Sequence, residues 1–148
     1  MPSALTSHTG YLLRAVSNHV SASFAARLAA TGTTVAEWVL LREAFDGDGL
    51  PPSQLASRMG LTRGGVTKLA DRLIARGLLA RTADDTDGRG QRLTLTDTGR
   101  SLVPHLATLA DQNEADLFGH LPPQDRAALD QMLRDLIAHH ALRTAPIR

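Results

Sequence analysis

The stretch 61–76, L-T-R-G-G-V-T-K-L-A-D-R-L-I-A-R, combines hydroxyls, cations and two glycines on one face of an expected helix. Its apolar residues recur at intervals of three and four, the pattern of a helix with one buried face. The other face carries Thr62, Arg63, Gly64, Gly65, Thr67, Lys68 and Arg72. Two glycines, which cost a helix roughly 1 kcal/mol each against alanine, would let the backbone lie close to another surface. Hydroxyls and cations suggest that this surface is a nucleic acid, and an ordinary solvent-exposed helix is the alternative.

Basic residues are concentrated around this stretch. The whole chain has 16 Lys and Arg against 15 Asp and Glu, a formal net charge of +1. Between Arg58 and Arg92, however, eight residues are basic and four are acidic, so the remainder of the chain is acidic. A basic cluster in an otherwise acidic chain is the electrostatic footprint expected of a nucleic-acid-binding protein.

The composition argues against several other classes. The 148 residues, 43% of them hydrophobic, suit one domain with a real core. There is neither a long apolar run nor a signal-peptide pattern, so we expect a cytoplasmic protein with no membrane partner. The absence of cysteine excludes disulfides, thiolate zinc sites and thiol redox sensing. The six histidines lack metal-ligand spacing and no catalytic motif is present, so we expect no enzyme, metal or cofactor.

A helix-turn-helix followed by a β-hairpin is predicted in the middle of the chain. A short helix over 53–59 ends at Gly60, a candidate left-handed cap, and Thr62 caps the next helix, which ends at Gly77. Two short strands, 78–81 and 92–96, flank a tip that is rich in turn-forming residues. Helix-turn-helix and hairpin together form a winged helix.

Longer helices are predicted on both sides of this unit, over 8–30, 97–120 and 124–140, with a further helix starting at the capping box T-V-A-E of 34–37. That helix should carry Trp38, Leu41 and Phe45 inward. The first and last helices have apolar stripes too wide for a small winged helix to bury, which favours a symmetric dimer over a monomer with an extended core. The expected fold is mainly α with a small β-hairpin wing. The single chain 1–148 would contain a winged helix-turn-helix (34–99) and a helical dimerisation region (8–30 and 100–142).

Two motifs resemble those of a known family. The family is the MarR family of bacterial transcriptional regulators. Its helix-turn-helix resembles the stretch 52–81, P-S-Q-L-A-S-R-M-G-L-T-R-G-G-V-T-K-L-A-D-R-L-I-A-R-G-L-L-A-R. Its wing signature, D-x-R followed by L-x-L-T-x-x-G, resembles the stretch 87–99, D-G-R-G-Q-R-L-T-L-T-D-T-G. The flanking helices match only in length and pattern. The resemblance implies a sequence-specific transcriptional regulator, often a ligand-responsive repressor, that binds double-stranded DNA. It also implies a homodimer with one recognition helix per subunit in successive major grooves of a pseudo-palindromic operator.

Roles on DNA can be assigned to the candidate residues as expectations. Arg63, Thr67 and Lys68 would lie near base edges, because Arg and Lys can donate to guanine O6 and N7. Thr62, Gly64 and Gly65 would bring the helix N-terminus against phosphate or the groove floor. The remaining phosphate candidates are Ser53, Gln54 and Arg72. Arg72 could instead be solvated or form an ion pair within the chain.

The wing adds three candidates. Arg89 would enter the minor groove, where narrow A·T tracts attract arginine. Asp87 would hold the wing by pairing with an arginine, or would simply form the turn. Arg92 would contact the DNA backbone or the hairpin surface.

The resemblance further implies a small aromatic or phenolic anionic effector, bound between the dimerisation and DNA-binding regions. Candidate contacts are His8, Tyr11, Trp38 and Arg42. Trp38 could instead be a core residue and Arg42 merely solvated. A winged helix used only as a protein-interaction module is the alternative function, although such an interface would not need Arg63, Lys68 and Arg89 to project together.

Overall fold

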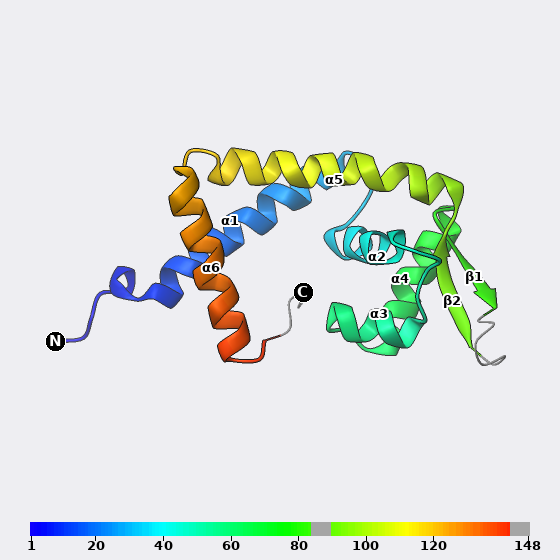
Figure 1. Cartoon of the computed structure of the whole chain (residues 1–148), viewed down its shortest axis with the longest axis horizontal. Coiled ribbons are helices and arrows are strands. Elements are labelled where there is room, and N and C mark those ends of the chain that lie inside the picture. Colours follow the sequence, from blue (N-terminus) through cyan, green and yellow to red (C-terminus); the bar gives the residue numbers. More distant parts are fainter. Residues whose placement is uncertain (84–89, 143–148) are drawn as a thin grey trace.

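The computed structural model describes residues 1–83 and 90–142, which form six α-helices, one short 3-10 helix and a two-stranded sheet (Figure 1). The fold class is the predicted one, mainly α with a β-hairpin. In chain order the elements are η1 (Leu5–Ser7), α1 (Thr9–Ala29), α2 (Val35–Phe45), α3 (Pro52–Met59), α4 (Arg63–Ala75), β1 (Leu79–Ala83), β2 (Gln91–Leu95), α5 (Asp97–Phe118) and α6 (Pro123–His139). Every predicted helix and strand is present, with small shifts at the ends.

The elements divide into a winged helix and a helical arm that share α5. Figure 1 shows α2, α3, α4 and the hairpin gathered at one end of the molecule, and α1 and α6 at the other, with α5 running from the hairpin to the start of α6. The C-terminal half of α1 packs beneath α5, and α2 lies between this contact and the helix-turn-helix. The arm is therefore joined to the winged helix through α5 and through the turn between α1 and α2.

Local signals in the sequence explain most helix boundaries. The Thr34 hydroxyl accepts the Glu37 N–H at 3.1 Å while Glu37 Oε1 accepts the Thr34 N–H at 3.2 Å, which completes the predicted capping box. Gly60 ends α3 in the left-handed region, at φ +67°. Thr62 caps α4 by accepting the N–H of Gly65 at 3.0 Å. These contacts each involve residues close in sequence, which is why the pattern alone predicts them.

The core lies between α2, α3, α4, the hairpin and the first half of α5. Its fully buried side chains include Leu28, Leu40, Leu41, Leu55, Met59, Val66, Leu73, Leu79, Leu93, Val103 and Leu106. Leu41 points inward as expected, whereas Trp38 and Phe45 are only half-buried at the edge of the core. The inward face of α2 is centred on Leu40, Leu41 and Ala44, because α2 packs against several elements rather than one.

The start of α5 is docked tightly on the helix-turn-helix, which gives a physical reason for the T-x-x-G part of the wing signature. Thr96 Oγ1 donates to the Gly77 carbonyl at 2.6 Å and accepts the N–H of Gly99 at 3.1 Å. A Cβ atom on Gly99 would lie 2.1 Å from the Leu78 carbonyl oxygen, so only glycine fits there. The hairpin pairs antiparallel from Leu79 opposite Leu95 to Ala83 opposite Gln91.

The helical arm leaves much apolar surface exposed in the single chain. On α1, Leu12 and Val16 are each 51% exposed, and on α6 Met132 is 59% exposed. α1 buries Leu28 fully, and α6 buries no residue fully. None of the helices within residues 1–83 and 90–142 combines the length and apolarity that a membrane span requires.

Candidate nucleic-acid interface

The first turns of α3 and α4 and the start of β2 open onto one shared hollow. It has a volume of about 510 Å³ and is lined by Pro51, Pro52, Ser53, Arg63, Thr67, Gly90 and Gln91. Ser53, Arg63 and Thr67 are thus brought together as predicted candidates. The sequence interpretation missed Gln91, an exposed polar residue at the beginning of the second hairpin strand.

The outer face of α4 carries its polar residues in two rows. At 100° per residue, Arg63 and Thr67 lie along one edge of this face and Lys68 and Arg72 along the other, with Gly64 and Asp71 between the rows. All six residues are exposed, and Asp71 pairs with Arg81. Because Val66, Leu69, Ala70 and Leu73 are buried on the opposite side, the packing of α4 fixes which face is presented outward.

Apart from Arg89 and Arg92, the cations of the basic cluster between Arg58 and Arg92 fall into two groups. Arg58 pairs with Glu43 at 3.2 Å, Arg76 with Glu37 at 2.9 Å and Arg81 with Asp71 at 2.6 Å. By contrast, Arg63, Lys68 and Arg72 form no ion pair within the described part of the chain. The intramolecular pair considered for Arg72 is therefore not formed among these residues, and its charge faces solvent together with those of Arg63 and Lys68.

The first turn of α4 offers backbone donors as well as side chains. The first N–H groups of a helix have no acceptor within it, and the helix dipole adds partial positive charge there. The Thr62 hydroxyl satisfies the N–H of Gly65, and the Thr67 hydroxyl donates to the Arg63 carbonyl at 2.9 Å. This end of α4 is suited to an anionic ligand that approaches along the helix axis.

The two glycines of this turn are not required by the fold. A Cβ on Gly64 would come no closer than 3.9 Å to a neighbouring atom, Thr62 Oγ1, and on Gly65 no closer than 3.4 Å. Both distances are ordinary van der Waals contacts or longer. The cost that the glycines impose on α4 therefore has no internal explanation, in contrast to Gly99.

The remaining DNA candidates differ in how they are placed. Gln54 is exposed on the first turn of α3 beside Ser53. Arg92 is half-buried and its Nη2 donates to the Gly49 carbonyl at 2.8 Å, which ties β2 to the loop before α3. Asp87 and Arg89 lie outside the described residues.

The four effector candidates lie in two separate places in one chain. His8 and Tyr11 are exposed at the start of α1, where His8 Nδ1 lies 3.1 Å from the Ala4 carbonyl oxygen. Trp38 packs edge-on against Phe24, with ring centroids 6.4 Å apart. Arg42 pairs with Asp46 at 3.0 Å. Tyr11 and Phe24 are about 20 Å apart along α1, so a single chain does not bring the four together.

No group of three or more metal-binding side chains converges in residues 1–83 and 90–142.

Comparisons with known proteins agree with this architecture. A family model described as MarR family matches residues 31–90. The HTH-type transcriptional repressor Rv2887 of Mycobacterium tuberculosis is 28% identical over 127 residues, which cover 86% of this chain and 91% of the relative. A solved structure of Rv2887, in complex with salicylic acid, has a TM-score of 0.68 at 28% identity and covers 87% of this chain and 96% of its own.

Two further solved structures resemble the whole chain. CouR from Rhodococcus jostii RHA1, bound to p-coumaroyl-CoA, has a TM-score of 0.82 at 28% identity and covers 93% of this chain and 94% of its own. BpsR from Bordetella bronchiseptica, whose DNA binding is regulated by 6-hydroxynicotinic acid, has a TM-score of 0.81 at 29% identity and covers 92% of this chain and 97% of its own. The motifs and the winged-helix fold agree with these comparisons: residues 31–90 match the MarR family model, and the proteins similar to most of the chain include transcriptional repressors and regulators.

Proposed function

We propose that this protein is a ligand-responsive transcriptional repressor that binds double-stranded DNA sequence-specifically, as a homodimer on a pseudo-palindromic operator. The observation that carries the proposal is the outer face of α4, where Arg63, Lys68 and Arg72 have no ion-pair partner in the described chain. Three unneutralised cations on one helix face have little reason to gather unless they meet an anion. The proteins that resemble the whole chain include repressors and regulators.

The geometry of α4 suits the major groove. Its exposed face lies between the start of α3 and β2, so contacts from Ser53, Gln54 and Gln91 to phosphates would flank base contacts from Arg63 and Thr67. Such phosphate contacts fix register, whereas side chains that reach base edges give sequence preference. Asp87, Arg89 and Arg92 remain expected wing contacts.

A homodimer accounts for the apolar surface of the arm. We call the exposed apolar residues of α1 and α6 the arm surface: Leu12, Leu13, Val16, Met132 and Leu136. Its α1 residues Leu12, Leu13 and Val16 also line an apolar hollow of about 580 Å³ between α1, α6 and the end of α5. A second copy of the chain would cover both, and a two-fold dimer would place two α4 helices one DNA turn, about 34–36 Å, apart. The protein would then act in the bacterial cytoplasm.

The proposed effector is a small aromatic or phenolic anion. Rv2887, CouR and BpsR are each connected with an aromatic acid or its thioester in the structures named above. Since His8 and Tyr11 lie far from Trp38 and Arg42 in one chain, a site using all four would need contributions from both subunits. An effector would release DNA only to the extent that it binds one dimer geometry better than another.

The test of this function is selection of bound duplexes from a random DNA library at two salt concentrations. We expect enrichment of a pseudo-palindrome and an affinity that falls steeply with salt, because each neutralised phosphate adds about 0.9 to the slope of log affinity against log salt. Equal binding to all duplexes, or no binding, would contradict a sequence-specific regulator. Once the operator is known, fluorescence of Trp38, the only tryptophan, can report effector binding.

Gly64→Ala is expected to change stability and DNA affinity in opposite directions. Alanine should stabilise α4 by up to about 1 kcal/mol, because the new methyl group would come no closer than 3.9 Å to a neighbouring atom. If α4 lies against DNA, the same methyl group would crowd the groove and lower operator affinity about tenfold, equivalent to about 1.4 kcal/mol. Thermal unfolding and operator titration measure the two effects.

Gly10→Ala is the matched control. Gly10 is the second residue of α1, as Gly64 is of α4, and a Cβ there has no neighbour within 4 Å. It should give a similar gain in stability with unchanged operator affinity. Unchanged affinity in Gly64→Ala as well would mean that the middle of the α4 face does not approach DNA.

A further inference from the structure

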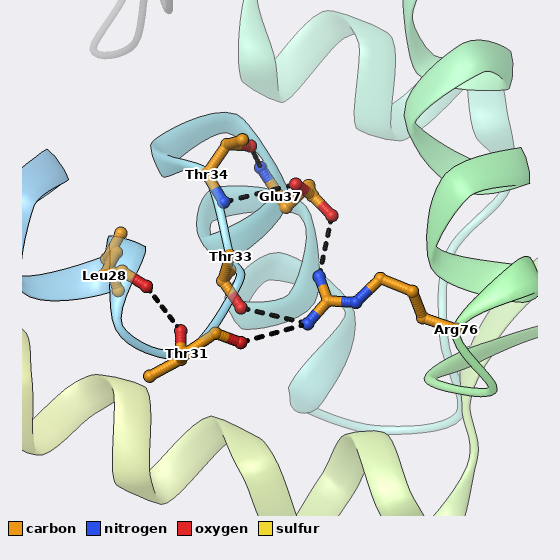
Figure 2. Close-up of polar contacts among 6 residues, drawn as sticks. All are labelled: Leu28, Thr31, Thr33, Thr34, Glu37 and Arg76. Carbon is orange, nitrogen blue, oxygen red and sulfur yellow. Dashed lines mark hydrogen bonds and ion pairs between the residues drawn. The ribbon is translucent and has the colours of Figure 1, made fainter.

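One arginine joins the end of α4 to the turn between α1 and α2 (Figure 2). Arg76 Nη1 donates to Glu37 Oε2 at 2.9 Å, and Nη2 donates to Thr33 Oγ1 at 3.3 Å and to the Thr31 carbonyl at 3.5 Å. The turn is itself held to α1, because Thr31 Oγ1 donates to the Leu28 carbonyl at 2.7 Å. A single guanidinium group therefore bonds to the turn that follows α1 and to the first turn of α2.

This contact differs from the other ion pairs of the basic cluster in its burial. Glu37 is 5% exposed and Thr33 is 3% exposed, whereas the carboxylates that pair with Arg58 and Arg81 are considerably more accessible. Both Glu37 oxygens are used, one by Arg76 and the other by the capping N–H of Thr34. A buried carboxylate strongly favours keeping its cation in place, since an unpaired buried charge is costly.

Arg76 acts at the end of α4 that lies away from the proposed DNA contacts. The helix spans 13 residues, about 20 Å. A tilt of about 10° at the Arg76 end would move its first turn by about 3 Å, close to the 3.4 Å rise of one base pair. A small tilt of α4 at the Arg76 end would therefore displace the Arg63 end by about the rise of one base pair.

α1 is fixed to α5 as well, by a second buried polar cluster. Asn113 on α5 is 2% exposed, and its Oδ1 accepts from Ser23 Oγ at 2.8 Å and from Arg27 Nε at 3.2 Å, while Arg27 also pairs with Asp116. These bonds hold the C-terminal part of α1 against α5. A displacement of the two helices would reach the end of α4 by two routes, through the start of α5, where Thr96 bonds to Gly77, and through the turn and Arg76.

We propose that Arg76, through Glu37 and Thr33, is a positioning residue that sets the tilt of the recognition helix α4 relative to the helical arm. In a dimer it thereby sets the half-site spacing that the protein accepts. The proposal rests on the proposed function, because spacing has meaning only for a dimer on DNA. Its consequence is that a ligand which shifts α1 relative to the winged helix would change DNA affinity through this contact.

The test compares spacing preference, not affinity alone. The selected operator is rebuilt with its two half-sites moved one base pair apart or together, and affinities are measured for the wild type, Arg76→Gln, Glu37→Gln and the double variant. Glu37→Gln retains an oxygen for the Thr34 N–H. We expect each single variant to reduce the wild-type preference for its best spacing by about fivefold or more. The double variant should be no worse than either single variant, because both remove the same contact.

Arg58→Gln is the matched control. Arg58 of α3 also pairs with a glutamate of another helix, Glu43 of α2, but Glu43 is not buried. It should retain the wild-type spacing preference despite the same change in charge. Arg76→Lys, which keeps a cation beside Glu37, provides a folded variant if Arg76→Gln unfolds. The spacing preference of Arg76→Lys should lie between those of the wild type and Arg76→Gln, because one ammonium group cannot reproduce all the hydrogen bonds of the guanidinium group.

The outcomes separate this proposal from the proposed function. An equal loss of affinity at every spacing, together with a lowered melting temperature, would reduce Arg76 to a purely stabilising role and overturn the inference. The same conclusion follows if Arg76→Lys and Glu37→Gln keep the wild-type preference. Failure of the wild type to prefer any duplex would instead contradict the proposed function.

Discussion

Val16→Asp is expected to convert the protein to a monomer and to weaken operator binding by about 10²–10⁴-fold, the usual advantage of two linked sites over one. Val16 is 51% exposed in the single chain and lines the hollow between α1, α5 and α6. Aspartate there costs the isolated chain little, because the position faces solvent. In the dimer it would leave a charge in an apolar interface without a partner. Analytical ultracentrifugation and titration of full operators and single half-sites measure the two effects.

Ser21→Asp provides the control for this variant. Ser21 is exposed on α1, on the polar side of the helix, so the same charge is added away from the arm surface. It should leave both the sedimentation coefficient and operator affinity unchanged. Binding of Val16→Asp to a single half-site should also match that of the wild type, because α4 is untouched. A dimeric Val16→Asp with normal affinity would mean that the arm surface is not the subunit interface.

The parts of the fold that could be predicted are those determined by residues close in sequence. Thr34 and Glu37 form a capping box because they are three residues apart, and Thr62 caps α4 for a similar reason. Gly60 adopts the left-handed conformation that a helix end requires. A pattern of residue types is sufficient for such contacts, since neither the core nor another element takes part.

Long-range contacts could not be predicted, and they change the interpretation of the basic cluster. In the sequence its eight cations look alike. The fold neutralises Arg58, Arg76 and Arg81 with acids from other elements, whereas Arg63, Lys68 and Arg72 of α4 keep their charges unpaired among the described residues. Periodicity correctly placed Leu41 in the core but overestimated the burial of Trp38 and Phe45, since α2 touches α1, α3, α4, α5 and β2 rather than a single neighbour.

The glycines show the same division between local pattern and tertiary packing. Gly64 and Gly99 both lie near the start of a helix, and the sequence cannot distinguish their roles. A Cβ at Gly99 would collide with the Leu78 carbonyl, whereas a Cβ at Gly64 has space. The packing of the chain therefore explains the glycine at position 99, but not the glycine at position 64. The comparison supports an external surface against the first turn of α4.

Arg63→Ala is expected to remove sequence preference at one base pair in each half-site without changing stability. The Arg63 side chain is exposed and lies in the hollow beside Thr67, so truncating it leaves the core intact. A bidentate contact to guanine discriminates by about 1–3 kcal/mol. Because a symmetric dimer makes the contact twice, the loss on a full operator should be about 2–6 kcal/mol. Repeating the random-library selection with this variant would show which two symmetric positions lose their preference.

Salt titration distinguishes a base contact from a phosphate contact. If Arg63 reads a base, Arg63→Ala should bind non-operator DNA almost as well as the wild type, with a nearly unchanged salt slope. If Arg63 neutralises a phosphate, affinity should fall uniformly across sequences and the slope should decrease by about one for each subunit. Arg58→Ala removes the same charge at a position paired with Glu43, and should therefore preserve the selected sequence. An unaltered sequence preference in Arg63→Ala would assign base recognition to the other row of the helix, that of Lys68 and Arg72, which lies on the opposite edge of the same face.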